Sequence, residues 1–311
     1  MMSAVQSCRR APYPRVDRAA VHVQDGQHYL EQGQTEEALA AFERALKENP
    51  KLVEAHVGVG EVHRREGDYP TAHRSFEHAT ALAPTDFEAN YGLALVKQLM
   101  GRVQEAVTVY LRALAIEPDS FRVSNDLAAA YLRLGRTEEA VPYAQRAVEL
   151  GSESQGAWAN LALAYSHSRQ YEEAVAAYRE ALELGAPAES LLLGLADSHI
   201  RLGRYERAIA VLRNQLRRQP LAVAHERLGY CQFKLRRFEG ALQSYHNAMT
   251  MDEKDTAALN GIGACLMTLY IHSDRRDRDQ RDEAIRSWQR SILLRPDQPN
   301  IIDLIARYRR I

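Results

Sequence analysis

Alanine recurs at a fixed spacing along this sequence, and this spacing limits the folds that the chain can adopt. Ala38 is followed at intervals of 34 residues by five more alanines, and then by two more after 33 and 43 residues: Ala72, Ala106, Ala140, Ala174, Ala208, Ala241 and Ala284. A second series of small residues lies upstream of the first: Gly26, Gly60, Ala94, Ala128, Ala162, Ala196, Gly229 and Gly263. Helices approach closely where side chains are small, so two such positions per period predict stacked helical hairpins.

The other positions of the period support helical hairpins. Four residues after each alanine stands a large side chain, except after Ala140, where the residue is Ala144. The large residues are Phe42, Phe76, Tyr110, Tyr178, Leu212, Tyr245 and Trp288. Three residues later the position is small again, except at Gln215: Ala45, Ala79, Ala113, Ala147, Ala181, Ala248 and Ser291. Prolines that bar helix continuation close five of the periods: Pro50, Pro84, Pro118, Pro220 and Pro296. Glycines five residues before the alanines predict turns between two helices: Gly33, Gly67, Gly101, Gly135 and Gly203.

This pattern resembles the tetratricopeptide repeat. Its signature is matched most closely by Trp158, Leu161, Ala162, Tyr165, Ala174, Tyr178 and Ala181. The resemblance covers residues 19–298 as eight repeats: 19–52, 53–86, 87–120, 121–154, 155–188, 189–222, 222–255 and 256–298. It implies an all-α fold, a right-handed α-solenoid superhelix of stacked hairpins.

The segments outside the regular repeats allow further predictions. Residues 1–18 hold four arginines without periodicity and are expected to form a flexible basic arm. The charged insertion 271–282 in the last repeat is expected to be a solvated loop or an exposed extension of two helices. Residues 299–311 are predicted to form a capping helix from about Asn300 to Arg310, which packs Ile301, Ile302, Leu304, Ile305 and Tyr308. Thr35 and Thr137 are predicted to cap helices, Pro70 to stand in a first helical turn, and Pro142 to bend its helix.

The composition restricts the kind of partner and the cellular compartment that we expect for this protein. The formal net charge of −1 argues against a nucleic-acid ligand, which requires clustered positive charge. Arginine outnumbers lysine 35 to 5, which predicts a bacterial source. Three cysteines without regular spacing argue against a disulfide framework, and Cys231 and Cys265 are expected to fill the core. Neither a signal peptide before Cys8 nor a segment long enough to cross a membrane is evident, so we expect a soluble, cytoplasmic protein.

The sequence contains no complete catalytic or metal-binding motif. Gly58-Val59-Gly60 lacks the lysine and hydroxyl residue that would complete a phosphate loop. His56 and His63 are seven residues apart, about two helical turns, which is too far for one metal ion. We therefore predict a protein that is not an enzyme and has no catalytic residues, cofactor or metal.

In the family that the chain resembles, the first helices of successive repeats line a concave groove that holds an extended peptide or a partner's helix. Carrying the groove positions over to this sequence gives ten candidate peptide-binding residues: Glu54, Glu61, Glu88, Tyr91, Leu95, Asn125, Asn160, Leu163, Tyr230 and Phe233. Gly58, Gly92, Asp126, Leu193, Asp197, Glu226 and Arg227 occupy further groove positions. The family's carboxylate clamp for chaperone tails needs lysine and asparagine at set positions of successive repeats. Those positions hold Val23 and Gln27, then Gly58, then Glu88 and Gly92, and in the later repeats Asn125 and Ala129 precede Asn160, so the clamp is incomplete in every register.

The candidates suggest a groove that changes character along the chain. Three glutamates in the early repeats predict an acidic wall, whereas Tyr230 and Phe233 predict an aromatic end, so a ligand with one basic and one apolar end would fit. The resulting prediction is a non-catalytic scaffold or adaptor that binds a protein or peptide. The alternatives are a self-associating assembly or regulatory subunit and, disfavoured by the charge, a single-strand nucleic-acid binder.

Overall fold

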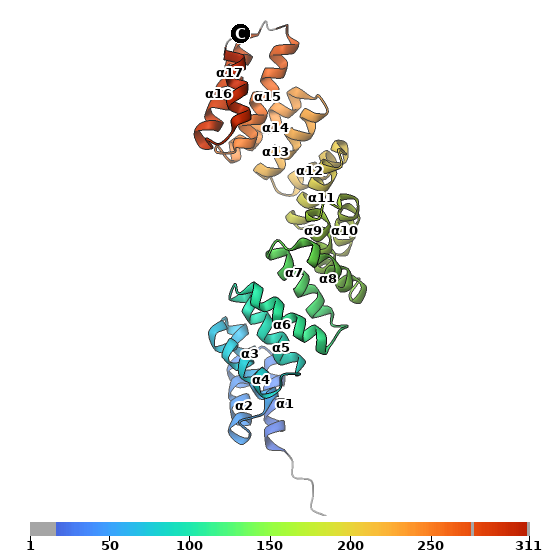
Figure 1. Ribbon diagram of the computed structural model, residues 1–311, viewed down its shortest axis with the longest axis vertical. Helices are drawn as coiled ribbons and strands as arrows, with labels where there is room; N and C mark the ends of the chain where they lie inside the picture. The colour runs from blue at the N-terminus through green and yellow to red at the C-terminus, as the bar shows by residue number, and fades with distance from the viewer. Residues whose placement is uncertain (1–16, 275–276, 310–311) are drawn as a thin grey trace, which may run out of the picture. The chain divides into compact units, whose positions relative to one another are not determined.

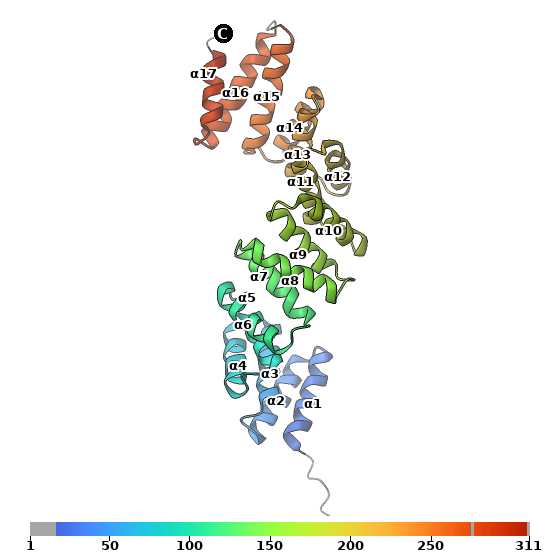
Figure 2. The same cartoon turned by 45° about the vertical axis from the view of Figure 1, so that its right-hand side comes forward.

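The computed structural model describes residues 17–274 and 277–309. Within these residues the chain forms seventeen α-helices and no β-strand, and consecutive helices pack together as hairpins (Figures 1 and 2). The predicted all-α fold of stacked hairpins is confirmed. Residues 1–16 of the predicted arm lie outside the described residues, but its last residue, Arg18, begins the first helix, with Asp17 as the N-cap.

The chain divides into two compact units, Met1–Leu150 and Gly151–Ile311. The helices of unit 1 are α1 (Arg18–Glu31), α2 (Thr35–Glu48), α3 (Val53–Glu66), α4 (Tyr69–Leu82), α5 (Phe87–Leu99), α6 (Val103–Ile116), α7 (Phe121–Arg133) and α8 (Thr137–Leu150). Those of unit 2 are α9 (Gln155–His167), α10 (Tyr171–Leu184), α11 (Glu189–Arg201), α12 (Tyr205–Arg218), α13 (Ala222–Lys234), α14 (Phe238–Met251), α15 (Thr256–His272), α16 (Arg278–Leu294) and α17 (Pro299–Arg309).

In each unit every helix packs on the next one, and most odd-numbered helices also contact the next odd-numbered helix. In the described part of unit 2 the exceptions are α15 with α17 and α11 with α13, whose backbones hardly approach each other although the side chains of Asp197 and Arg227 pair between α11 and α13. The loss of one residue from the repeat spacing falls between α11 and α13, at the start of the seventh predicted repeat.

The glycines of the repeat lie where aromatic rings of neighbouring helices pack against the backbone. Phe42 of α2 is 1% exposed and lies between α1 and α3. A Cβ atom added to Gly26 of α1 would lie 2.7 Å from this ring, and one added to Gly58 of α3 would lie 2.4 Å from it. Phe76 is held in the same way by Gly60 and Gly92. Phe42 and Phe76 therefore each need two consecutive odd-numbered helices that carry glycine at the point of contact.

This packing explains why two predicted groove positions hold glycine. Gly58 and Gly92, which the family pattern places on the groove, are buried against the rings of Phe42 and Phe76. In unit 2 the ring of Tyr245 is likewise enclosed, since Cβ atoms on Gly229 and Gly261 would lie 2.9 and 2.2 Å from it. The alanines of the first series are all fully buried, as their spacing predicts.

Helix ends follow local chemistry, with one wrong prediction. Asp86, Ser120 and Ser154 accept hydrogen bonds from backbone N–H groups at the starts of α5, α7 and α9. The predicted threonine caps are wrong: Thr35 is the first helical residue of α2, where the preceding Gln34 makes no side-chain cap, and Thr137 is likewise the first residue of α8. The acidic first turn of α2 and the early position of Pro70 in α4 agree with the prediction.

The tight turns after the odd-numbered helices require a left-handed residue. Gly33, Gly67, Gly101, Gly135 and Gly203 all have positive φ, between 70 and 82°. Arg169 and Arg236 stand at the same place in unit 2 with φ of 61°, a conformation that a side chain makes unfavourable.

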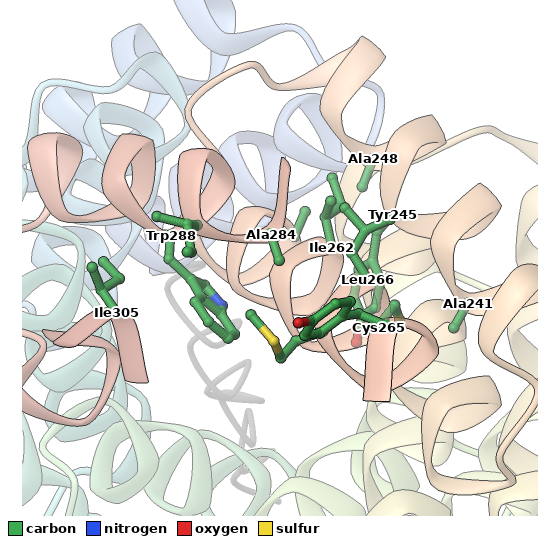
Figure 3. Packing of buried hydrophobic residues seen from close by; sticks show 13 residues of the cluster. Ala241, Tyr245, Ala248, Ile262, Cys265, Leu266, Ala284, Trp288 and Ile305 are labelled. Atoms are coloured by element: carbon green, nitrogen blue, oxygen red, sulfur yellow. The ribbon is translucent and has the colours of Figure 1, made fainter. Parts of the chain in front are cut away.

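The last helices of unit 2 form one buried cluster. Figure 3 shows Tyr245 of α14, Leu266 of α15, Trp288 of α16 and Ile305 of α17 together in it. The charged insertion extends two helices, because α15 continues to His272 and α16 begins at Arg278. Ile302 of α17 was placed on the packed side by the sequence, but 47% of its surface is exposed.

Candidate functional site

The odd-numbered helices of unit 1 enclose a small pocket. Its volume is about 280 Å³, and we call it the unit 1 pocket. It is lined by Val57, Glu61 and Arg64 of α3, Glu88, Tyr91, Gly92 and Leu95 of α5, Phe76 of α4 and Arg122 of α7. Four predicted groove residues, Glu61, Glu88, Tyr91 and Leu95, therefore meet in one place.

The charges of the unit 1 pocket neutralise one another. The guanidinium of Arg64 donates two hydrogen bonds of 2.6 Å to the Glu61 carboxylate, and Arg65 Nε donates another of 2.9 Å. Burial alone raises the pKa of Glu61, but these hydrogen bonds and the arginine charges outweigh it, so the pKa falls below its usual value. Arg122 pairs with Glu88 in the same way. The predicted acidic wall is thus wrong for these two glutamates, whose charges are matched by arginines.

A tyrosine and a buried aspartate complete the unit 1 pocket. Tyr91 Oη donates a hydrogen bond of 2.8 Å to Asp126 Oδ2, and the Arg122 guanidinium lies 4.7 Å from the centre of the Tyr91 ring. Burial raises the pKa of Asp126, while the hydrogen bonds from Tyr91 and Asn125 oppose the rise. Burial and the neighbouring Asp126 raise the pKa of Tyr91, which stays protonated at physiological pH. The pocket is a closed network of partners.

A larger pocket lies on the odd-numbered helices of unit 2. Its volume is about 820 Å³, and we call it the unit 2 pocket. Its lining comes from α9, α11, α13 and the adjoining ends of α10 and α12: Ser166, His167, Arg169, Tyr171, Asp197, Ile200, Arg201, Tyr205, Glu226, Arg227 and Tyr230. The unit 2 pocket is thus larger than the unit 1 pocket.

The acidic groups of the unit 2 pocket are held differently from those of unit 1. Arg227 Nη2 forms an ion pair of 2.8 Å with Asp197 Oδ2. Burial raises the pKa of Asp197, and the charges of Arg227 and Arg201 oppose this. Burial, with the nearby carboxylates of Asp255 and Asp197, raises the pKa of Glu226 to about 7 against the opposing charge of Arg227.

The remaining predicted groove residues are scattered. Tyr230 lines the unit 2 pocket, with its ring centre 6.3 Å from that of Tyr205. Phe233 is partly buried against the cluster of Figure 3, and its ring lies 5.5 Å from that of Phe238. Glu54 and Leu163 are exposed outside both pockets, and Asn125 and Asn160 are half-buried.

Sequence reasoning missed four residues of the unit 2 pocket: Tyr171, Arg169, Arg201 and Tyr205. They lie at helix ends and in a turn, whereas the family pattern counts positions along the first helix of each repeat. One signal was available: Arg169 occupies a turn position that holds glycine in five other hairpins.

In the described part of the chain, no group of three or more histidine, cysteine, aspartate or glutamate side chains could hold a metal ion. Nor is any helix there both long and apolar enough to cross a membrane. Cys231 and Cys265 are free and fully buried, and burial raises the pKa of each thiol to about 12, whereas Cys8 lies outside the described residues.

Comparison with known families now decides the family of the chain. A tetratricopeptide-repeat model for the C-terminal domain of cilia and flagella-associated protein 70 matches residues 2–189, more than half of the sequence. The chain belongs to this family of tetratricopeptide repeats. A general tetratricopeptide-repeat model matches residues 193–266. The resemblance found in the sequence is confirmed, while the number of repeats and a bacterial source stay predictions.

Solved structures share the fold of this tetratricopeptide-repeat protein. The Pseudomonas aeruginosa pilF structure is 20% identical with a TM-score of 0.59, and the match covers 67% of this chain and 95% of that one. A tetratricopeptide repeat protein from Parabacteroides merdae is 16% identical with a TM-score of 0.53, covering 80% and 99%. YrrB, described as having an unusual peptide-binding site, is 18% identical with a TM-score of 0.51, covering 63% and 96%. No curated protein matches the chain. At these identities the likeness shows the fold alone.

Proposed function

We propose that this chain is a non-catalytic scaffold that binds extended peptide segments of partner proteins on its odd-numbered helices. The observation that carries the proposal is that both pockets lie on these helices and combine aromatic rings with charged side chains. Such a lining suits a peptide, because rings bury apolar side chains and charged groups fix register. YrrB, which shares the fold, is described as having a peptide-binding site.

Screening random twelve-residue peptides against the full chain tests the proposal. Bound peptides are measured again with Leu95→Ala in the unit 1 pocket and Tyr230→Ala in the unit 2 pocket. Leu111→Ala is the matched control, because Leu111 is exposed on the even-numbered helix α6. We expect one of the two pocket variants to weaken each peptide at least ten-fold, and the control to leave binding unchanged.

Two outcomes would count against a peptide-binding scaffold. The first is a natively folded chain that binds no peptide in the screen. The second is equal weakening by Leu111→Ala and the pocket variants, since this would place the contact elsewhere. Light scattering of the same samples distinguishes the alternative, a self-associating subunit, whose mass would exceed that of one chain without any ligand.

A further inference from the structure

The unit 2 pocket contains more positive charge than its own acids neutralise. Arg227 is paired with Asp197. Arg169 and Arg201 also line the pocket, and the guanidinium group of neither makes a hydrogen bond or a close ion pair within the described residues. Surface arginines are often unpaired, so this alone selects no ligand.

An unsatisfied donor in the same pocket points to a missing acceptor. Nη1 of Arg227 is buried and has no hydrogen-bond partner among the described residues, although Nη2 of the same side chain is engaged by Asp197. A buried guanidinium N–H without an acceptor costs free energy that a ligand oxygen would recover. Guanidinium groups select carboxylate or phosphate oxygens, so this donor and the two arginines without ion-pair partners favour an acidic ligand.

The pocket's second acid does not cancel the two free arginines. Burial raises the pKa of the Glu226 carboxyl, on α13, and so disfavours its ionisation. Its charged neighbours are Asp197 of α11, Arg227 of its own helix and Asp255 at the start of α15. With its pKa near 7, this carboxyl is partly protonated at neutral pH. The pocket then carries net positive charge in a chain whose formal net charge is −1.

The apolar walls of the pocket indicate that the ligand carries apolar groups beside its negative charge. Tyr171, Tyr205 and Tyr230 present rings, and Ile200 adds an aliphatic surface. A free ion would leave these surfaces uncovered, whereas a peptide can cover them with apolar side chains next to its carboxylates.

We propose that the unit 2 pocket binds an acidic peptide segment of a partner protein. Aspartate or glutamate carboxylates of the segment are held by Arg169, Arg201 and the free N–H of Arg227, and its apolar side chains pack on the tyrosine rings. This inference rests on the proposed peptide-binding function and adds the chemical class of the ligand.

Fluorescence anisotropy with three matched peptides tests this ligand class on the full chain. The first twelve-residue peptide alternates leucine with aspartate and glutamate, the second replaces the acids by their amides, and the third by lysine. We expect the acidic peptide to bind at least ten-fold more tightly than its amide twin, and the lysine peptide not to bind. Its affinity should fall as salt rises from 50 to 500 mM, because exposed charges are screened.

Variants locate the binding. Arg169→Gln and Arg201→Gln should each weaken the acidic peptide at least five-fold, whereas the matched control Arg207→Gln, an exposed arginine of α12, should not. If inorganic phosphate alone displaces the peptide at equal ionic strength more effectively than sulfate or chloride, and the leucines add no affinity, the site binds simple anions and the inference fails.

Failure of the ligand class is distinguishable from failure of the scaffold function. Equal binding of the amide twin, weakened by Tyr230→Ala but not by Arg201→Gln, would overturn the acidic specificity and leave peptide binding intact. Absence of binding by all three peptides, together with a negative random screen, would remove the proposed function itself.

Discussion

The pockets of units 1 and 2 occupy the same side of the same kind of hairpin, yet they differ at their floors. Gly92 forms the floor in unit 1, under the ring of Phe76. The equivalent place in unit 2 holds Arg227, and the preceding even-numbered helix has Leu212 where α4 has its phenylalanine. The ring of Phe76 leaves room only for glycine at this place, whereas the smaller Leu212 accompanies the side chain of Arg227, which lines the unit 2 pocket.

Their charges differ accordingly. In unit 1, Glu61 and Glu88 each meet an arginine, so no cation of that pocket is left over. In unit 2, one arginine is paired and two are not. The difference teaches that the packing position decides whether a pocket of this fold is self-contained or ready for a charged ligand.

The largest expected effect tests the floor of the unit 1 pocket. Gly92→Ala would place a Cβ atom 2.2 Å from the Phe76 ring, so overpacking should lower the free energy of unfolding by about 2–3 kcal/mol. Gly156→Ala in α9 is the matched control, because its nearest neighbour would be 3.8 Å away and alanine favours helix by about 0.5–1 kcal/mol. Urea unfolding measures both, and an unchanged midpoint for Gly92→Ala would contradict the packing rule.

The second effect tests the closed network of the unit 1 pocket. Tyr91→Phe removes the hydroxyl that donates to the buried Asp126, so stability should fall by about 1–2 kcal/mol. Tyr230→Phe in the unit 2 pocket removes a hydroxyl without a protein partner in the described residues and should change stability by less than about 0.5 kcal/mol. Thermal unfolding of the two variants side by side decides, and equal losses would show that the pockets do not differ in this respect.

The third prediction concerns pH and has opposite signs in the two pockets. The folded pKa of Glu226 is raised from 4.5 to about 7, so its ionisation destabilises the fold progressively between these pH values. Glu226→Gln should therefore raise Tm at pH 8 by about 2–4 °C and leave it unchanged near pH 4.

The folded pKa of Glu61 is lowered, so its charge stabilises the fold above pH 4.5, and this stability is lost as pH falls through the folded value. Glu61→Gln should lower Tm slightly at pH 8, since the pair is partly exposed, and the loss should disappear in acid. Scanning calorimetry at both pH values tests the pair, and shifts of one sign would refute the contrast.

The smallest effect concerns the turn beside the unit 2 pocket. Arg169→Gly removes the strain of a side chain at a φ of 61°. Glycine also gives the unfolded chain more conformational freedom, which offsets part of this gain, so the free energy of unfolding should rise by about 0.5 kcal/mol. Arg236→Gly has the same starting φ and lies outside the pocket, so it should match this gain. Only the first variant should weaken acidic peptides. A loss of binding with both would indicate that the turns, rather than the Arg169 charge, support the pocket.

The helical hairpins were predictable because small and large residues alternate in a fixed register. Ala38 and Phe42 occupy the small and the large position that recur in each repeat, so the sequence alone predicts that both are buried. The groove residues were predictable only in part. Tyr91 and Leu95 meet in a pocket as their positions imply, but the family register cannot show that Arg64 and Arg122 cancel the acids beside them.

The unit 2 pocket was not predictable from repeat positions. Two of its cations come from a turn and a helix end. Side chains such as Arg169 and Arg201 stand outside the set of positions that the family pattern marks, so only the folded arrangement brings them together.

The ring held between two successive odd-numbered helices has a consequence for recombination among such chains. Phe42 matches Gly58 as closely as it matches Gly26, so a transplanted hairpin would meet a foreign neighbour across a contact that was never fitted to it. No module of two helices keeps such a ring with both of its neighbours. A cut at hairpin boundaries separates Phe42 from Gly58, and a cut offset by one helix, so that α2 stays with α3, separates it from Gly26. The shortest segment that carries this contact intact is the three helices α1 to α3.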